Sequence, residues 1–334
     1  MHGWIILDKP LGLGSTQGVS AVKRCLRQGG YGKGIKVGHG GTLDPLATGV
    51  LPIAVGEATK LAGRMLDSDK VYDFTIRFGE QTSTLDAEGE VVATSDVRPT
   101  RAALEAVLAR FTGPITQVPP AYSALKIDGE RAYDLARAGE EVVLASRAVT
   151  IHSLISSPAR GGEPFASANG GGGETLGDSL TEAPLHHPSD GPPPRAGEDL
   201  EEVTLTAHVS KGTYIRSLAR DIALALGTVG HVTMLRRTKA GPFTLAPAIS
   251  LDKLNEMGQA ATLEQILLPL RAGLDDIPAL ALDPDQAGAL RQGRVLAGIA
   301  VDDGQYFAML GDIPVALVEA LDEQVRVVRG FNLD

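Results

Sequence analysis

The residues best suited to chemistry lie in one short segment, Val37 to Pro52 (VGHGGTLDPLATGVLP). A carboxylate on a glycine-rich loop can act as a nucleophile or a base, because the missing side chains let a ligand approach closely. Asp44 is that carboxylate, and His39 lies five residues before it. Composition alone favours a structural alternative, in which Asp44 caps a helix that begins with Pro45. From these residues alone both interpretations stay open.

Three further segments place polar residues beside turn-forming ones. They are Leu7 to Pro10 (LDKP), Val118 to Lys126 (VPPAYSALK) and Val209 to Arg216 (VSKGTYIR). Taken singly, the first is typical of a turn, the second of a turn that leads into a strand, and the third of a strand that runs into a capped helix. Their joint occurrence carries more information than any one of them.

Several common kinds of active site are excluded because their sequence motifs are missing or incomplete. Gly32 and Lys33 are followed by Gly34, where a phosphate-binding loop needs Ser or Thr, and the glycine pattern of dinucleotide sites fails at Gln17. The seven histidines show no metal-ligand spacing, and the serine-hydrolase motif G-x-S-x-G is missing. The single cysteine, Cys25, excludes a disulfide framework and a cysteine-based zinc site. We therefore expect neither a metal nor a cofactor.

Length and hydropathy indicate a cytoplasmic protein. The 334 residues are enough for two domains. No apolar run approaches the roughly 18–20 residues of a membrane span, and the first ten residues lack the basic flank and the length of a signal peptide. A single cysteine also fits a reducing compartment. We expect no membrane partner.

The net charge of −10 hides a basic block. Residues 203–250 carry six basic side chains and one acidic side chain, whereas residues 157–202 and 251–334 are strongly acidic. A polyanion responds to the local potential and not to the global sum. The overall charge therefore does not exclude nucleic acid as a partner.

Strands and helices without a regular β-α-β period must position these residues. Alternation predicts strands over 71–78, 148–154 and 203–209, and amphipathic periodicity predicts helices over 100–111 and 213–226. On the second of these helices, Arg216 and Arg220 are expected to share the polar flank.

The chain also divides by composition. Residues 157–202 are rich in glycine and proline, which predicts a flexible insertion, because such a segment buries too little apolar surface to offset the entropy of ordering it. The strands on either side of it are expected to pair, since the cost of closing a loop grows only slowly with its length. After about residue 274 short strands and turns predict a small β-rich domain behind a helical linker.

Together the motifs resemble those of the TruB family of tRNA pseudouridine-55 synthases. The matching segments are, in chain order, Asp8 to Gly12 (DKPLG), Gly38 to Leu51 (GHGGTLDPLATGVL), Gly56 to Lys60 (GEATK), Ser68 to Tyr72 (SDKVY), Pro120 to Lys126 (PAYSALK), Ser210 to Arg216 (SKGTYIR) and Leu235 to Arg237 (LRR). Their order and spacing cover residues 3–250 apart from the insertion, and the resemblance weakens over the last 60 residues.

The resemblance implies a fold of the α+β class. In this pseudouridine synthase fold a mixed, largely antiparallel sheet is flanked by helices and followed by a small β-rich, PUA-like domain. We accordingly expect a catalytic domain at 1–250 with the insertion at 157–202, a helical linker at 251–274 and the PUA-like domain at 275–334.

The resemblance also implies an activity, the isomerisation of uridine 55 in the T-arm of tRNA to pseudouridine. The uracil leaves its ribose through nitrogen and rejoins it through carbon, so no cofactor is needed. Asp44 is the implied nucleophile, acting on a flipped-out base. Arg216 is implied to keep Asp44 charged and oriented, and Tyr72 to stack on the uracil.

Supporting roles come from the same resemblance. His39 is implied to fill the space that the flipped base leaves, Lys9 and Pro10 to support the pocket behind Tyr72, and Leu235 to form its apolar wall. The remaining residues expected to bind RNA are Tyr214, Lys211, Arg236 and Arg237.

Two alternatives remain beside this prediction. One is a pseudouridine synthase that depends on a guide RNA, and the other is an RNA-binding or RNA-folding protein without chemistry. We expect a monomer. The sequence does not decide whether Asp44 attacks the ribose or the base, or assists in another way.

Overall fold

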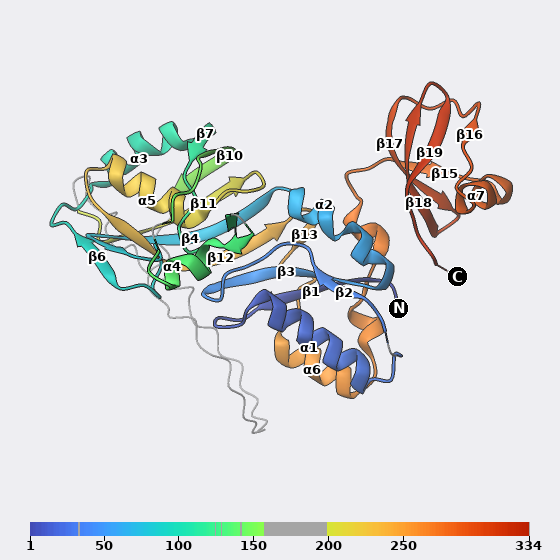
Figure 1. Ribbon diagram of the computed structural model, residues 1–334, viewed down its shortest axis with the longest axis horizontal. Coiled ribbons are helices and arrows are strands. Elements are labelled where there is room, and N and C mark those ends of the chain that lie inside the picture. The colour runs from blue at the N-terminus through green and yellow to red at the C-terminus, as the bar shows by residue number, and fades with distance from the viewer. Residues whose placement is uncertain (33, 124, 128, 141, 157–198, 334) are drawn as a thin grey trace, which may run out of the picture.

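The computed structural model describes residues 1–334 except 33, 124, 128, 141, 157–198 and 334 (Figure 1). The insertion predicted at 157–202 therefore lies almost entirely outside the described residues. Within the described part of the chain, no helix is both long enough and apolar enough to cross a membrane.

A ten-stranded sheet forms the centre of the larger part of the molecule (Figure 1). Its strands run in the order β14 (Leu268–Pro269), β1 (Gly3–Lys9), β3 (Ala47–Val55), β12 (Gly230–Ala240), β4 (Lys70–Phe78), β11 (Glu202–Val209), β10 (Arg147–Ser156) and β7 (Gly113–Gln117), with β2 (Val37–His39) on β3 and β13 (Phe243–Thr244) on β12. The β3–β12 pair is parallel and the other pairs are antiparallel. This confirms the mixed, largely antiparallel sheet of an α+β fold.

The strands expected from alternation are present as β4, β10 and β11. β10 and β11 pair antiparallel, with Leu154 opposite Ala207, so the strands on either side of the insertion meet as predicted. The helix expected at 100–111 consists of α3 (Arg101–Leu108) and a 3₁₀ turn, η2 (Ala109–Phe111). The second predicted helix is α5 (Ile215–Ala225), which begins two residues later than expected, because Tyr214 has an extended backbone and is the N-cap residue.

Two pairs of helices cover the two halves of the sheet. α1 (Ser15–Gln28) and α6 (Leu251–Gln259) lie side by side near β1 and β3, whereas α3 and α5 lie near β4, β11 and β10 (Figure 1). Each pair encloses its own apolar core with the strands beneath it. Tyr72 on β4 and Leu235 on β12 pack against both cores, which places them where the two halves meet.

Alternation along β1 gives the sheet a second buried face. Ile5 and Leu7 belong to the core under α1, whereas Trp4 and Ile6 belong to a core on the other side. That other core also takes in Phe307 from the C-terminal part of the chain. Period-two burial thus lets a single strand contact two layers.

The C-terminal part of the chain forms a separate five-stranded sheet. Its order is β15 (Ala279–Ala281), β17 (Gly304–Leu310), β18 (Ile313–Leu321), β19 (Gln324–Gly330) and β16 (Leu296–Ala297), accompanied by α7 (Pro284–Arg291). This agrees with the β-rich C-terminal part that the resemblance implies, while the exact boundary at residue 275 stays a prediction.

The segment expected to be a helical linker, 251–274, contains α6 and two 3₁₀ turns, η3 (Leu263–Ile266) and η4 (Leu270–Gly273). It also contributes β14 to the edge of the large sheet. The remaining short elements are η1 (Gly56–Leu61), α2 (Ala62–Asp67), β5 (Glu80–Thr82), β6 (Val91–Thr94), β8 (Lys126–Ile127), β9 (Glu130–Arg131) and α4 (Ala132–Arg137).

Candidate active site

Asp44 lies on the loop between β2 and β3, and it caps no helix. The Asp44 carbonyl accepts a hydrogen bond from Ala47 N at 3.0 Å, and Ala47 is already the first residue of β3. The helix that Pro45 was expected to start is therefore absent, and the structural alternative for Asp44 is wrong. The loop leads instead into a buried strand, since Val50 to Val55 are completely buried or nearly so.

Side chains of Ser15, at the start of α1, and Lys9, at the end of β1, hold the backbone of this loop. The buried Ser15 hydroxyl accepts from Leu43 N at 2.8 Å and donates to Leu43 O at 2.9 Å. The Lys9 ammonium, also buried, donates to Leu13 O at 2.7 Å and to Pro45 O at 3.2 Å. The residues on both sides of Asp44 are thus fixed, although its own side chain is not touched by these groups.

Arg237 on β12 also holds the loop that carries Asp44. Its guanidinium is buried, with a relative exposure of 1%, and donates to Val50 O at 2.8 Å, Thr42 O at 3.2 Å and Gly41 O at 3.2 Å. A guanidinium that is buried this deeply and bound to three carbonyl groups shapes the loop that carries Asp44. Arg237 also lines the cleft, and the expectation that it binds RNA stays a prediction.

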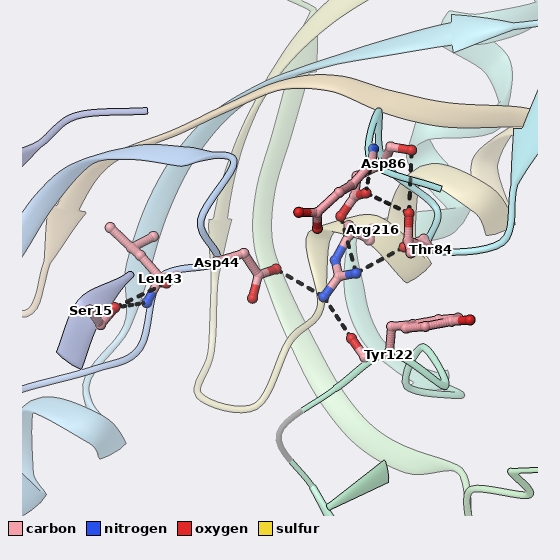
Figure 2. Close-up of polar contacts among 8 residues, drawn as sticks. Ser15, Leu43, Asp44, Thr84, Asp86, Tyr122 and Arg216 are labelled. Atoms are coloured by element: carbon pink, nitrogen blue, oxygen red, sulfur yellow. Dashed lines mark hydrogen bonds and ion pairs between the residues drawn. The ribbon is translucent and has the colours of Figure 1, made fainter. Parts of the chain in front are cut away.

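Arg216 joins the loop to the other half of the sheet. Its Nη2 lies 2.9 Å from Asp44 Oδ2, and its Nη1 lies 3.2 Å from Asp86 Oδ2 (Figure 2). The same guanidinium donates to Thr84 O at 2.8 Å and to Tyr122 O at 3.0 Å. The Arg216 side chain is only 7% exposed. It therefore points inward, and the expectation that it shares a polar flank with Arg220 is wrong.

The two carboxylates on Arg216 differ in their surroundings. Asp86 is 11% exposed, whereas Asp44 is 42% exposed. The Asp86 Oδ1 atom also accepts hydrogen bonds from Glu88 N at 3.0 Å and from the Thr84 hydroxyl. Asp86 is thus a fixed anchor for the guanidinium, while Asp44 keeps much of its carboxylate exposed.

Asp44 opens into a cleft of about 1420 Å³ between the two halves of the sheet. Tyr72, Leu235 and His39 line this cleft together with Asp44 and Arg216. Sites for small molecules usually measure about 300–1,000 Å³. The cleft is therefore larger than a site built for one small ligand, and the structure brings the predicted catalytic residues together in it.

Burial changes the ionisation of three groups around the cleft. It lowers the pKa of His39, with a smaller effect in the same direction from the Arg237 charge, so the His39 ring is neutral at pH 7. It lowers the pKa of Lys9 to about 8, although the charge of Asp44 acts in the opposite direction. It also raises the pKa of Tyr214. Desolvation disfavours the charged form in all three cases.

Other predicted residues lie at or outside the cleft rim. Tyr214 lines it beneath the Arg147 guanidinium, whose carbon is 5.4 Å from the ring centroid. Pro10 is exposed and absent from the described cleft lining, and its carbonyl accepts from Lys9. Lys9 contacts the loop of Asp44 through Pro45 O, and the pocket support expected of Lys9 and Pro10 stays a prediction.

The remaining two predicted cations are already paired. Arg236 Nη2 lies 2.8 Å from Asp8 Oδ2, and Lys211 Nζ lies 3.0 Å from Asp67 Oδ1. Both side chains are accessible, at 28% and 64% exposure respectively. Contact with RNA phosphates therefore stays a prediction for these two residues.

Several residues of the site were not predicted from the sequence. Asp86 stands among many acidic residues of its segment, so its type carries no signal, and Ser15 is an ordinary helix-start residue. Arg131 and Arg137 line the cleft as well, and their guanidinium carbons lie 5.7 and 5.5 Å from the centroid of the Tyr133 ring. A basic-aromatic-basic spacing in this segment is the one signal that could have found them.

Two family models match most of the chain that builds this site. Residues 26–161 match the TruB family pseudouridylate synthase N-terminal domain, and residues 216–275 match the tRNA pseudouridylate synthase B C-terminal domain. The chain is 64% identical over 333 residues to the tRNA pseudouridine synthase B of Novosphingobium aromaticivorans, covering 100% of this chain and 98% of that protein. It is 55% identical over 332 residues to the tRNA pseudouridine synthase B of Zymomonas mobilis, covering 99% and 96%.

Solved structures share the fold at lower identity. A chain of the H/ACA RNP bound to a substrate RNA containing 2'-deoxyuridine matches with a TM-score of 0.66 and 21% identity, covering 99% of this chain and 85% of that one. A chain of the archaeal box H/ACA sRNP Nop10–Cbf5 complex matches with a TM-score of 0.64 and 21% identity, covering 98% and 85%. These likenesses support the fold alone. The domain matches and the sequence identities together establish that the chain belongs to the TruB family of pseudouridylate synthases.

Proposed function

We propose that this chain converts uridine 55 in the T-arm of tRNA to pseudouridine, without a cofactor, and that Asp44 is its nucleophile. The observation that carries the proposal is the position of Asp44, which is held by Arg216 at 2.9 Å and remains 42% exposed toward the cleft. Relatives that bear the name tRNA pseudouridine synthase B support tRNA as the substrate. The matching catalytic loop supports uridine 55.

The reaction needs a carboxylate and little else. The bond between ribose C1' and uracil N1 breaks, the base rotates, and a new bond joins C1' to C5. The proton on C5 is lost and N1 takes up a proton, so the product is an isomer of uridine. No electrons are gained or lost overall. Asp44 is placed to attack either the ribose or the base, or to stabilise the charge that develops while the base is detached. Arg216 orients the carboxylate through the paired Oδ2 atom.

Tyr72 and Leu235 are suited to receive the uracil. They lie where the two apolar cores meet and line the cleft beside Asp44. An aromatic face is worth about 1–3 kcal/mol per stacked base. The target uracil must leave its stack in the RNA to reach Tyr72 and Leu235. We assign His39, a neutral ring that lines the same cleft, to the space that the base vacates in the RNA.

The RNA backbone is proposed to follow exposed cations at the cleft. Arg131, Arg137 and Arg147 line it, and Lys211 and Arg236 lie on the neighbouring strands and turns. Each phosphate contact releases counterions, so binding of tRNA should weaken steeply as the salt concentration rises. We expect the chain to act as a monomer, and a tRNA substrate supports a cytoplasmic location.

The decisive test incubates the purified chain with an unmodified tRNA transcript and maps pseudouridine by position. We expect modification at position 55 without any guide RNA. Modification that appears only after a guide RNA is added would favour the guide-dependent alternative. Binding of the transcript without any pseudouridine would favour a protein that binds or folds RNA without chemistry.

A further inference from the structure

Three side chains that the proposed function does not use come together outside the cleft. They are Asp69, His152 and His208, and one donor atom from each lies within 4.8 Å of the others. On β11, His208 alternates with Ala207 and Val209, which face the core under α5. The three side chains therefore lie on the opposite face of the sheet from that core.

A β-bulge places the two histidines next to each other. Ile151 pairs with Val209 and Ser153 pairs with His208, so His152 is the extra residue in β10. A bulge of this kind turns a side chain out of the normal alternation. As a result the two imidazole rings are neighbours, with centroids 4.7 Å apart and planes tilted by 46°.

Asp69 reaches the same place from the residue just before β4. Its backbone is fixed, because Asp69 O accepts from Gly241 N at 2.9 Å. In the register of the sheet Val71 is opposite His208, so Asp69 lies on the diagonal of that histidine. The Asp69 Oδ2 atom is 3.2 Å from His152 Nε2 and 3.6 Å from His208 Nε2.

These separations fit the edges of a small coordination tetrahedron. Zinc binds imidazole nitrogen at about 2.0–2.1 Å and carboxylate oxygen at about 2.0–2.2 Å, which puts neighbouring ligand atoms of a tetrahedral site roughly 3.4 Å apart. The two distances to Asp69 Oδ2 lie on either side of that value. Imidazole nitrogen favours first-row transition metals, whereas Mg²⁺ and Ca²⁺ prefer oxygen ligands alone.

We propose that Asp69, His152 and His208 bind one divalent transition-metal ion of the zinc class, with a fourth position open to water. The three side chains are between 37% and 47% exposed, so an ion enters without any rearrangement of the backbone. The ion links β10, β11 and the start of β4 across the sheet. The site departs from the expectation of no metal, because the ligands lie far apart in the sequence and only strand pairing unites them.

The test uses the full chain, stripped with a chelator and dialysed, then titrated with ZnCl₂ by calorimetry. We expect saturable binding of one ion per chain and a higher midpoint of thermal unfolding, because the ion binds the folded state. His152→Ala and His208→Ala should each weaken binding by at least about tenfold. A His186→Ala/His187→Ala variant, which removes an adjacent histidine pair of the sequence, should bind as the parent chain does.

A second measurement on the unmodified chain does not depend on how the variants fold. Co²⁺ in a four-coordinate site gives strong visible absorption, whereas six-coordinate Co²⁺ absorbs weakly, and we expect the strong band, displaced by Zn²⁺. The proposal is overturned if no saturable Zn²⁺ binding is found, if binding survives in a His152→Ala/His208→Ala variant, or if Co²⁺ shows only the weak spectrum. Pseudouridine formation should be the same in the His152 and His208 variants, because neither residue lines the cleft.

Discussion

The two halves of the large sheet contribute unlike parts to the cleft. The half under α1 supplies Asp44 on a loop whose backbone is held by Ser15 and Arg237, and it leaves the carboxylate 42% exposed. The half under α5 supplies Arg216, whose side chain is 7% exposed and contacts Asp86 and two carbonyl groups.

This difference shows how the main chain around a carboxylate can be fixed while its side chain stays accessible. One half fixes the main chain around Asp44 and spares its side chain. The other half encloses the cation almost completely, so that Arg216 can orient Asp44 without being drawn away by solvent. Pre-organisation of this kind costs no rearrangement at the moment of reaction.

Removing the cation from the α5 half should have the largest effect. Arg216→Ala leaves Asp44 and Asp86 without their shared partner, and the loss of one member of a buried pair costs about 3–5 kcal/mol. If that loss falls on the reaction barrier, turnover drops about 10²- to 10⁴-fold. Single-turnover assays and filter binding with tRNA measure turnover and affinity separately.

Affinity for tRNA should change little in Arg216→Ala, since Arg216 is buried and is not one of the exposed cations proposed to contact the RNA backbone. Arg220→Ala is the matched control, because Arg220 lies one helical turn later and donates to Val118 O instead. Normal turnover in Arg216→Ala would show that the two halves are not coupled through this residue.

Removing the cation beneath the α1 half should act first on stability. Arg237→Met leaves the carbonyl groups of Gly41, Thr42 and Val50 without donors, and the free energy of unfolding should fall by about 3 kcal/mol. Urea unfolding measures this change. Arg236→Met, which removes the partly exposed contact with Asp8 and a long hydrogen bond to the Thr48 hydroxyl, should cost less than about 1 kcal/mol. Equal losses in the two variants would contradict the different roles of these adjacent arginines.

A smaller effect should result from Ser15→Ala. This change removes the hydroxyl that contacts both the amide and the carbonyl of Leu43, at a cost of about 1–3 kcal/mol in stability, with a parallel drop in turnover. Ser20→Ala on the same helix is the control, because Ser20 is exposed and its hydroxyl contacts only Thr16 O. Calorimetric unfolding and a steady-state assay would together show whether the loop depends on Ser15.

The smallest effect concerns pH. Burial lowers the pKa of His39, so the unfolded chain takes up this proton near pH 6.5 while the folded chain takes it up only at lower pH. Unfolding therefore becomes easier as the pH falls below 6.5, by at most about 1.4 kcal/mol per pH unit for this one group. The slope should be shallower in His39→Gln. An unchanged slope would mean that His39 titrates alike in both states.

Part of this arrangement could be predicted from sequence and part could not. Alternation located β4, β10 and β11, the loop motif indicated Asp44, and the family resemblance indicated Arg216 as its partner. Periodicity predicted that Arg216 lies on an exposed polar flank of its helix. A helical pattern cannot show that this flank faces a cleft with the carboxylates of Asp44 and Asp86. The adjacent Arg236 and Arg237 look alike in sequence, yet strand alternation sends one to the surface and buries the other under the loop.

The cluster of Asp69, His152 and His208 is a second feature that sequence patterns could not predict. Sequence spacing reveals metal ligands when they share a turn or a helix. Here His152 and His208 lie on β10 and β11, which pair with a bulge and are separated in sequence by the insertion, so no local sequence pattern indicates that they meet. Asp86 escaped for a related reason, since its meaning depends on Arg216, which is distant in the chain.

The most direct test of the central role of Asp44 is Asp44→Asn in a single-turnover reaction with an unmodified tRNA transcript. The amide preserves the shape of the side chain and removes its charge, so the fold and the affinity for tRNA should persist. We predict that no pseudouridine forms at position 55 while the transcript still binds. Formation of pseudouridine at the parent rate would contradict it.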